Sequence, residues 1–295
     1  MSTQVLFSKL LAVFLLSLTA LGCGAPAGGA TTGQAIQTIE NKGSDTLLQV
    51  AQLWAETYME QHPEVRISVN GGGSGTGIAA LINGTVDIAN ASREMKPEEI
   101  ERARERGINP IEHVVARDAI AVVVNPSNPI DRLTFQQVAD IFTSKVTNWK
   151  EVGGEDRPIV ALSRESNSGT YVFFLENVVQ VGAGDPNALF SPETLLLLSS
   201  EVISREIEQN PNAIGYDGLG YVTAGQKAIA VAAAPGEPFV QPSIESVNQG
   251  LYPIARPLYV YTNGEPTGMI KTYLDWVLSE EGQALVEQVG FVPLK

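Results

Sequence analysis

The stretch RESNSGTYVFF, residues 164–174, places an arginine and a run of small polar residues directly before an aromatic sequence typical of the first turns of a helix. The first N–H groups of a helix have no partner within the helix, and the helix dipole makes that end locally positive. Ser168, Gly169 and Thr170 therefore indicate a helix start suited to hold an anion, and Arg164 adds forked charged donors. Taken alone, the same residues also fit an ordinary N-cap.

Two more segments of the chain have the same chemistry. Residues 42–48, KGSDTLL, and residues 71–77, GGGSGTG, each lie between an expected strand and an expected helix. The first segment contributes Ser44, Asp45 and Thr46, and the second contributes Ser74. Because such loops gather at the carboxyl ends of parallel strands, we expect all three to face one oxyanion. The competing interpretation is that three well-capped helices share a composition.

Arg93 follows another expected strand, in the segment DIANASREM at residues 87–95. An arginine in that place can present two donors in a fixed plane to an oxyanion. The alternative is a surface ion pair with Glu94 or Glu98.

Strands and helices alternate along the whole chain, which predicts an α/β fold with mainly parallel sheets flanked by helices. The β-branched apolar run at 114–126 is typical of a strand with both faces covered. The segment KPEEIERARERG predicts a helix with a solvated charged face. Other strands are expected at 37–43, 65–70 and 87–92, and helices at 46–63, 194–209 and 269–289.

The N-terminus has the pattern of an exported protein. Lys9 precedes a short apolar stretch that ends in Ala20-Leu21-Gly22-Cys23, and this predicts a signal peptide over residues 1–22. Cys23 is the only cysteine, so no disulfide can form within the chain. Its position resembles a bacterial lipoprotein box, and residues 23–35 then read as a flexible tether. We expect a lipidated, membrane-anchored protein in the periplasm or at the cell surface; an ordinary signal peptide is the alternative.

Composition excludes several classes of function. The net charge of −14 argues against nucleic acid as a partner and requires that any anion be caught by local donors. The chain has two histidines and one cysteine, and none of them forms a pair with metal-ligand spacing. The segment GGSGT fails the Gly-x-Ser-x-Gly pattern, and no P-loop motif occurs. We therefore expect no catalytic residue, no cofactor and no metal.

Several motifs together resemble the phosphate-binding proteins of bacterial phosphate ABC transporters, which have the type II periplasmic binding-protein fold. The motifs are GSDT, GGGSGTGI, NGTVDIANASRE, LTFQQVADIFTSKVTNWKEVGG, RESNSGTY, NAIGYDGLGYV and EGQALVEQVGFVPL. The resemblance covers nearly the whole mature chain.

The resemblance implies a two-lobed monomer that binds inorganic phosphate in a cleft and delivers it to ABC transporter permease subunits. The first lobe would comprise residues 36–118 and 252–295, and the second 119–251, with strands crossing near 119–124 and 252–257. The first lobe would hold phosphate through Ser44, Asp45, Thr46 and Ser74, and Arg93, expected from its own position after a strand, would add a charged donor. The second would hold it through Arg164, Ser168, Gly169 and Thr170.

The chain departs from this family at Arg93, where some members have an aspartate that accepts a hydrogen bond from protonated phosphate. Sulfate has no such proton, so an acceptor is how a site of donors can tell the two anions apart. We expect Asp45 to replace that acceptor, and Asp87 to be structural. Two alternatives stay open: the ligand is another tetrahedral oxyanion (sulfate, molybdate or tungstate), or the protein is a phosphate-sensing surface lipoprotein.

Overall fold

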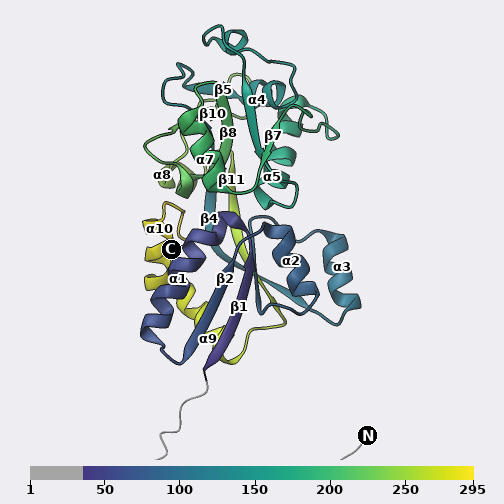
Figure 1. Ribbon diagram of the computed structural model, residues 1–295, viewed down its shortest axis with the longest axis vertical. Coiled ribbons are helices and arrows are strands. Elements are labelled where there is room, and N and C mark those ends of the chain that lie inside the picture. Colours follow the sequence, from purple (N-terminus) through teal and green to yellow (C-terminus); the bar gives the residue numbers. More distant parts are fainter. Residues whose placement is uncertain (1–35) are drawn as a thin grey trace, which may run out of the picture. The chain divides into compact units, whose positions relative to one another are not determined.

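The computed structural model describes residues 36–295. The expected signal peptide and Cys23 lie outside the described residues. The described chain forms an α/β fold, as expected, around one long curled sheet (Figure 1). The strands of that sheet are β1 (Gln37–Gly43), β2 (Val65–Asn70), β3 (Ile88–Ala91), β4 (Pro110–Val124), β6 (Val160–Arg164), β7 (Leu195–Leu197), β8 (Ala213–Gly218), β9 (Lys227–Ala228) and β11 (Ala255–Asn263).

The strand order is β2-β1-β3-β11-β4-β8-β6-β7, with β9 beside β4. The pairs β1–β2, β1–β3, β6–β8 and β6–β7 are parallel, as expected. Strands β11 and β4 lie between these two groups of parallel strands. Strand β11 is antiparallel to β3, β4 is antiparallel to β8, and β4 and β11 are antiparallel to each other. Strand β4 pairs with β11 as far as Ala119 and with β8 from Ile120 onward. It therefore joins two groups of parallel strands, and a separate small sheet pairs β5 (Arg132–Thr134) with β10 (Ala230–Ala232).

The fold has two lobes, each with its own hydrophobic core. We call the first lobe β1–β3 with the helices that pack on them: α1 (Asp45–Gln61), α2 (Ser74–Ile82), α3 (Pro97–Glu105), α9 (Gly268–Val277) and α10 (Glu280–Gln288). The second lobe comprises β5–β10 with α4 (Phe135–Phe142), α5 (Gly169–Phe174), α6 (Gln180–Ala183), α7 (Ser200–Gln209) and α8 (Ile244–Asn248). Strands β4 and β11 run between the lobes (Figure 1).

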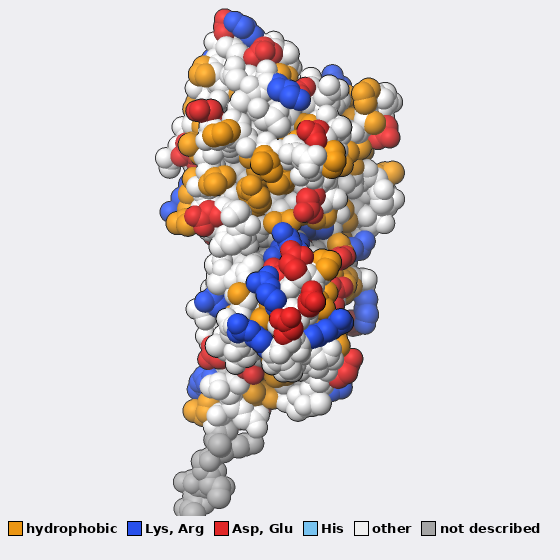
Figure 2. Space-filling view, turned by 90° about the vertical axis from the view of Figure 1, so that its right-hand side faces the viewer, with side chains coloured by type: hydrophobic (Ala, Val, Ile, Leu, Met, Phe, Trp, Pro, Cys, Tyr) orange, Lys and Arg blue, Asp and Glu red, His pale blue; other side chains and the backbone are white. Residues whose placement is uncertain are grey.

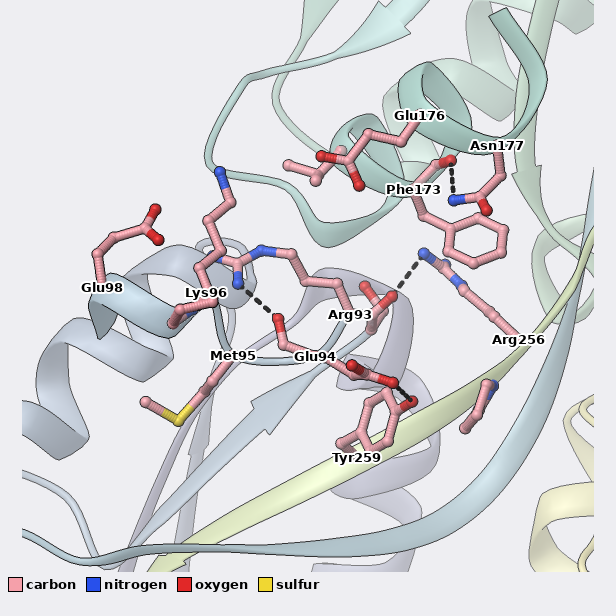
Figure 3. A pocket seen from close by; sticks show the side chains of 14 residues that line it. Arg93, Glu94, Met95, Lys96, Glu98, Phe173, Glu176, Asn177, Arg256 and Tyr259 are labelled. Atoms are coloured by element: carbon pink, nitrogen blue, oxygen red, sulfur yellow. Dashed lines mark hydrogen bonds between the residues drawn. The ribbon is translucent and has the colours of Figure 1, made fainter. Parts of the chain in front are cut away.

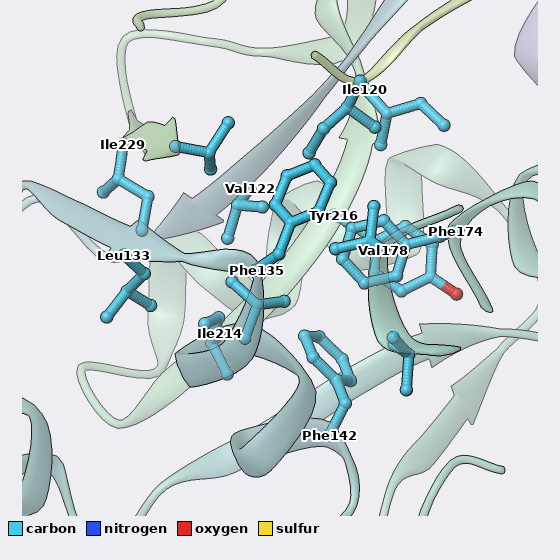
Figure 4. Close-up of a cluster of buried hydrophobic side chains, with 14 of the residues drawn as sticks. Ile120, Val122, Leu133, Phe135, Phe142, Phe174, Val178, Ile214, Tyr216 and Ile229 are labelled. Carbon is cyan, nitrogen blue, oxygen red and sulfur yellow. The ribbon is translucent and has the colours of Figure 1, made fainter. Parts of the chain in front are cut away.

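Aromatic rings pack among aliphatic side chains in the core of the second lobe (Figure 4). The ring of Phe174 stacks on that of Tyr216 with 3.8 Å between centroids, and Phe142 meets both rings edge-on. The Tyr216 hydroxyl hydrogen-bonds to Ser163 Oγ at 2.6 Å, so the buried polar atom has a partner. This packing fixes the end of β6 and the start of α5, which carry the segment RESNSGT at residues 164–170.

Two predicted helices are wrong in part. Residues 195–197, expected to be helical, form β7 and pair with β6, and α7 begins only after Ser199, whose side chain accepts a hydrogen bond from the Val202 N–H. The predicted helix at 269–289 is two helices, because Ser279 caps α10 by accepting from the Gly282 N–H. In both cases a serine cap interrupts a run of good helix formers.

The charged helix α3 lies at the surface with Ala103 buried and most of its charged side chains exposed, as expected. Figure 2 shows these charges gathered on the first lobe, whereas hydrophobic side chains are more frequent on the same face of the second lobe. Within residues 36–295, no helix is both long and apolar enough to cross a lipid bilayer.

Candidate ligand-binding site

The three helix starts singled out in the sequence meet at the junction of the two lobes. Strands β1 and β2 are parallel neighbours, so their carboxyl ends bring the starts of α1 and α2 to the same edge of the sheet. The start of α5, from the second lobe, faces them. Thr46 Oγ1 and Thr170 Oγ1 lie 2.8 Å apart, and the Gly75 N–H donates to the Asn167 carbonyl at 3.0 Å. Loops of the two lobes are therefore in direct contact.

Gly169 is the tightest point of this contact. A Cβ added at Gly169 would lie 2.5 Å from both Ser74 Oγ and Ser92 Oγ, which belong to the first lobe. Those two hydroxyls are hydrogen-bonded to each other at 3.2 Å, and Ser74 Oγ also accepts from the Ser92 N–H. Only glycine allows α5 to approach the first lobe this closely.

Ser168 is the N-cap of α5, because its hydroxyl accepts hydrogen bonds from the N–H groups of Thr170 and Tyr171 at 3.2 and 3.4 Å. Ser168 is therefore an N-cap, which is one of the two interpretations of residues 164–174. This role does not exclude a ligand, since Ser168 and Thr170 are also buried between the lobes.

Arg164 links the lobes from the end of β6. Its side chain is buried, and Nη2 donates to Asp45 Oδ2 at 2.7 Å and to the Leu198 carbonyl. The other oxygen of Asp45 accepts from the Gly72 N–H at 2.8 Å. Nε of Arg164 is buried and has no hydrogen-bond partner among the described residues. An unsatisfied buried donor is costly, so this N–H is a natural partner for an anion.

Arg256, on β11, is a member of the site that the sequence analysis missed. Its Nη2 donates to Thr170 Oγ1 at 2.8 Å, and its Nη1 donates to the Ser92 carbonyl at 2.8 Å. Figure 3 shows the Arg256 side chain in the pocket. The guanidinium forms a buried ion pair with Asp118, at 2.9 Å from Nη2 to Oδ2. Burial raises the pKa of Asp118, and the charge of Arg256 opposes that rise. The sequence contained a signal for this pair, because Arg256 and Asp118 are each a charged residue within a mainly apolar strand.

Arg93 lies next to the site but is committed to another partner. Its guanidinium makes two hydrogen bonds to the Glu99 carboxylate, at 2.7 and 2.8 Å, and a third to the Glu94 carbonyl. Burial raises the pKa of Glu99, but the hydrogen bonds from Arg93 and from the Lys96 N–H bring it below its usual value. The ion-pair alternative considered for Arg93 is therefore observed, with Glu99 in place of Glu94 or Glu98.

Two further candidates occupy different places. Ser44 is buried at the start of α1, and its N–H donates to the Asn90 carbonyl at 2.9 Å. Asp87 lies at the other end of β3, where its carboxylate accepts from the Glu40 N–H. Asp87 is thus separated from the meeting point of the loops by the length of the strand, in keeping with the structural role expected for it.

A pocket of about 600 Å³ opens beside the hydroxyl groups and has walls from both lobes (Figure 3). Ser92 and Arg256 line it next to the meeting point of the loops, and Phe173 and Glu176 line it from the second lobe. The site as a whole offers hydroxyls, helix N–H groups and buried guanidinium groups, which are the donors that an oxyanion requires.

Comparison with known proteins agrees with this chemistry. A family model described as a PBP superfamily domain matches residues 28–281. The phosphate-binding protein PstS of Pseudomonas aeruginosa is 35% identical over 273 residues, which cover 87% of this chain and 83% of that protein. The chain belongs to the PBP superfamily and, within it, to the PstS family. This is a family of substrate-binding transport proteins and not a class of enzymes.

Other PstS relatives and solved structures extend the comparison. The PstS protein of Bacillus subtilis is 32% identical over 253 residues, covering 85% of this chain and 79% of that protein. A crystal structure of a putative phosphate ABC transporter substrate-binding protein with bound phosphate, from Clostridium perfringens, has a TM-score of 0.78 and 33% identity. The structural match covers all of that chain and 88% of this one. The family and the two-lobed fold expected from the sequence are confirmed.

Proposed function

We infer that this protein binds inorganic phosphate outside the cytoplasm and delivers it to the permease subunits of an ABC transporter. The names of the PstS relatives and the phosphate-bound structure from Clostridium perfringens support this inference. The observation that carries it in this chain is the meeting of three helix starts with two buried arginines at the junction of the lobes.

The mechanism follows from contacts that only a closed pair of lobes can make. A ligand that touches the helix starts of both lobes favours the closed state, because its differential affinity shifts the equilibrium between open and closed forms. Each water lost from the anion is replaced by a hydroxyl, an N–H group or a guanidinium. Closure then presents one defined surface to the permease. For the moving parts we propose residues 36–118 with 252–295, and residues 119–251.

The proposed ligand-binding residues are those expected from the sequence, with Arg256 added. Ser44, Asp45, Thr46, Ser74, Arg93, Arg164, Ser168, Gly169 and Thr170 make up that expected set. Arg93 has weaker support, since Glu99 holds both of its Nη groups, although its Nε is buried and has no hydrogen-bond partner among the described residues. Arg256 has stronger support, because it already donates to Thr170 Oγ1 between the lobes.

Asp45 is our proposed determinant of selectivity for protonated phosphate. Both of its oxygens already accept hydrogen bonds, from Arg164 and from the Gly72 N–H, and each retains a second lone pair for a proton of the ligand. Sulfate would bring no proton to this carboxylate and would be repelled by its charge. We expect Asp45→Asn to bind sulfate measurably better than the parent does; an unchanged rejection of sulfate would remove Asp45 from this role.

We also propose that the protein is a monomer anchored by a lipid on Cys23. The support is the apolar stretch before this cysteine, which is followed by a tether of small residues. Mass spectrometry of the N-terminal peptide tests the lipid, and Cys23→Ser should release the protein from the membrane fraction. An unmodified Cys23 in the purified protein would contradict the proposal, and light scattering tests the monomer.

Calorimetric titration tests the ligand directly. The purified protein is unfolded and refolded to remove carried-over ligand, and is then titrated with phosphate, sulfate, molybdate and tungstate. Tight binding of phosphate, with no heat from the other anions, is the expected result. Binding of another of these anions with none of phosphate would retain the site and overturn the named ligand.

A further inference from the structure

A buried hydrogen-bond relay lies directly behind Arg164 in the second lobe. Asp217 is at the end of β8, and Ser200 is the first residue of α7; both side chains are fully buried. Ser200 Oγ accepts from Arg164 Nη1 at 3.0 Å and donates to Asp217 Oδ1 at 2.7 Å. A hydroxyl has one proton, so these two bonds fix its direction: the guanidinium donates to Ser200, and Ser200 donates to the carboxyl group.

The two oxygens of Asp217 differ in their surroundings. Oδ1 accepts from Ser200 and from the Gly218 N–H at 2.9 Å. Oδ2 is buried and has no hydrogen-bond partner among the described residues. A buried carboxylate oxygen without a donor disfavours the charged form, whereas protonation at Oδ2 leaves the relay through Oδ1 intact.

Charged groups from several strands face Asp217. Arg164 on β6 and Arg256 on β11 favour its ionised form, and Asp118 on β4 opposes it. Tyr221 follows β8, and burial raises its pKa; the negative charge of Asp217 raises this pKa further. With the ion pairs Arg164–Asp45, Arg256–Asp118 and Arg93–Glu99 counted as charged, each pair sums to zero. The network then has a charge of −1 when Asp217 is ionised and zero when it is protonated.

We propose that Asp217, acting through Ser200, is a positioning residue for Arg164 whose proton sets the charge that a bound anion meets. The proposal rests on the proposed function, because it concerns how the same site binds its oxyanion. Asp217 does not touch the ligand: it holds the guanidinium from behind, and its ionised form adds one negative charge within the buried network.

The burial of Asp217 determines whether anion affinity rises or falls with pH. Desolvation raises the pKa of Asp217 to about 7, against the attraction of Arg164. Below that pH the carboxyl group is neutral and the buried charges cancel. Above it, the site has one excess negative charge, and an anion binds either more weakly or together with a proton taken up by Asp217.

The experiment measures the dissociation constant of phosphate for the parent protein and for Asp217→Asn at several pH values from 5.5 to 8.5. The ratio of the two constants cancels the titration of phosphate itself, because both proteins meet the same ligand. We expect a ratio near one at pH 5.5, and parent binding at least threefold weaker than that of the variant at pH 8.5. Asp131→Asn, which removes an exposed charge from the second lobe, should give a ratio that does not change with pH.

Ser200→Ala provides a second route to the same question. It removes the acceptor of Arg164 Nη1 and the donor to Asp217, so phosphate affinity should fall at every pH. The ligand-free melting temperature should also fall relative to the Asp131→Asn control, because two buried polar groups lose a partner. If Asp217→Asn does not fold, the parent and Ser200→Ala are compared over the same pH range. Because the variant removes the Oδ1 donor, the pH at which its affinity falls should shift upward.

The outcomes separate the two claims. If the parent binds another oxyanion and not phosphate, the named ligand is wrong, and the same ratio is measured with that oxyanion. If Asp217→Asn changes affinity by the same factor at all pH values, or not at all, the proposed role of Asp217 is overturned while phosphate binding stands.

Discussion

Gly169 shows how one residue can decide whether two lobes meet. Alanine is favoured over glycine in a helix, so Gly169→Ala should leave the ligand-free protein at least as stable as the parent. The added methyl group would nevertheless press on the hydroxyls of Ser74 and Ser92. We expect phosphate affinity to fall at least tenfold by calorimetry.

Gly182→Ala is the matched control, because its Cβ would lie 2.1 Å from the Phe135 carbonyl within the second lobe. That clash does not depend on closure, so this variant should lose melting temperature in the absence of ligand. A Gly169→Ala protein that binds phosphate as tightly as the parent would show that the lobes do not close as described.

The buried pair of Arg256 and Asp118 gives a prediction on stability. Arg256→Met leaves a buried carboxylate without its partner, which costs about 3–5 kcal/mol. Adding Asp118→Leu removes that charge too, so the double variant should regain most of the loss, measured as the free energy of unfolding in urea. Equal stability of the single and double variants would contradict the isolated-charge explanation.

The residues of the site could be predicted from the sequence only where they are neighbours in it. Arg164, Ser168, Gly169 and Thr170 lie within seven positions, so the strand–loop–helix pattern indicated them together. Arg256 was missed because its partners are distant in sequence: it pairs with Asp118 and donates to Thr170. The commitment of Arg93 to Glu99 was equally hidden, since side-chain direction decides between several nearby carboxylates.

At the scale of elements, periodicity predicted most strands and helices but not the points where they are interrupted. The leucines at 195–198 favour a helix by composition, and only pairing with β6 makes residues 195–197 a strand. In the same way, nothing in the apolar pattern at 269–289 shows that α9 ends at Val277. Long-range pairing and local caps override propensity in both segments.

Ser279 allows a test of how much a local cap contributes to the break between α9 and α10. Its hydroxyl accepts from the Gly282 N–H at 3.3 Å and donates to the Trp276 carbonyl at 2.6 Å, so it both starts α10 and ties it to α9. Ser279→Ala should cost about 0.5–2 kcal/mol in the free energy of unfolding. Ser279→Asp keeps the acceptor and is the control. Equal losses in the two variants would show that the contact with Trp276, and not the cap, is what matters.

At the scale of the whole molecule, the fold places two hydrophobic cores on two shared strands, β4 and β11. Each core is built mainly within its own lobe, but Tyr221 of the second lobe packs in the first core beside Phe291, and Val292 packs in the second core. Bending at β4 and β11 therefore has to move these two side chains. The contacts between the lobes at the helix starts are polar: the ion pair of Arg164 with Asp45, the hydroxyls of Thr46 and Thr170, and the loop bonds at Asn167. Polar contacts of this kind are readily exchanged for water, which suits a clamp that opens and closes.

A variant of Asn167 can test the role of these polar contacts, because Asn167 is not among the proposed ligand-binding residues. Its side-chain Nδ2 donates to the Gly72 carbonyl of the first lobe at 3.0 Å, and its backbone carbonyl accepts from the Gly75 N–H. Asn167→Ala removes only the first bond, which is worth about 1 kcal/mol, or about a fivefold change in affinity. Because the bond exists only in the closed form, the change should appear mainly as faster phosphate release in stopped-flow measurements, with the association rate unchanged.

Asn187→Ala is the matched control for this experiment, since Asn187 is exposed in the second lobe away from the junction. It should release phosphate at the parent rate. If Asn167→Ala instead slowed association and left release unchanged, the loop contact would form before the ligand is enclosed. The lobes would then close first at Asn167, and the order of events assumed for the clamp would have to be reversed.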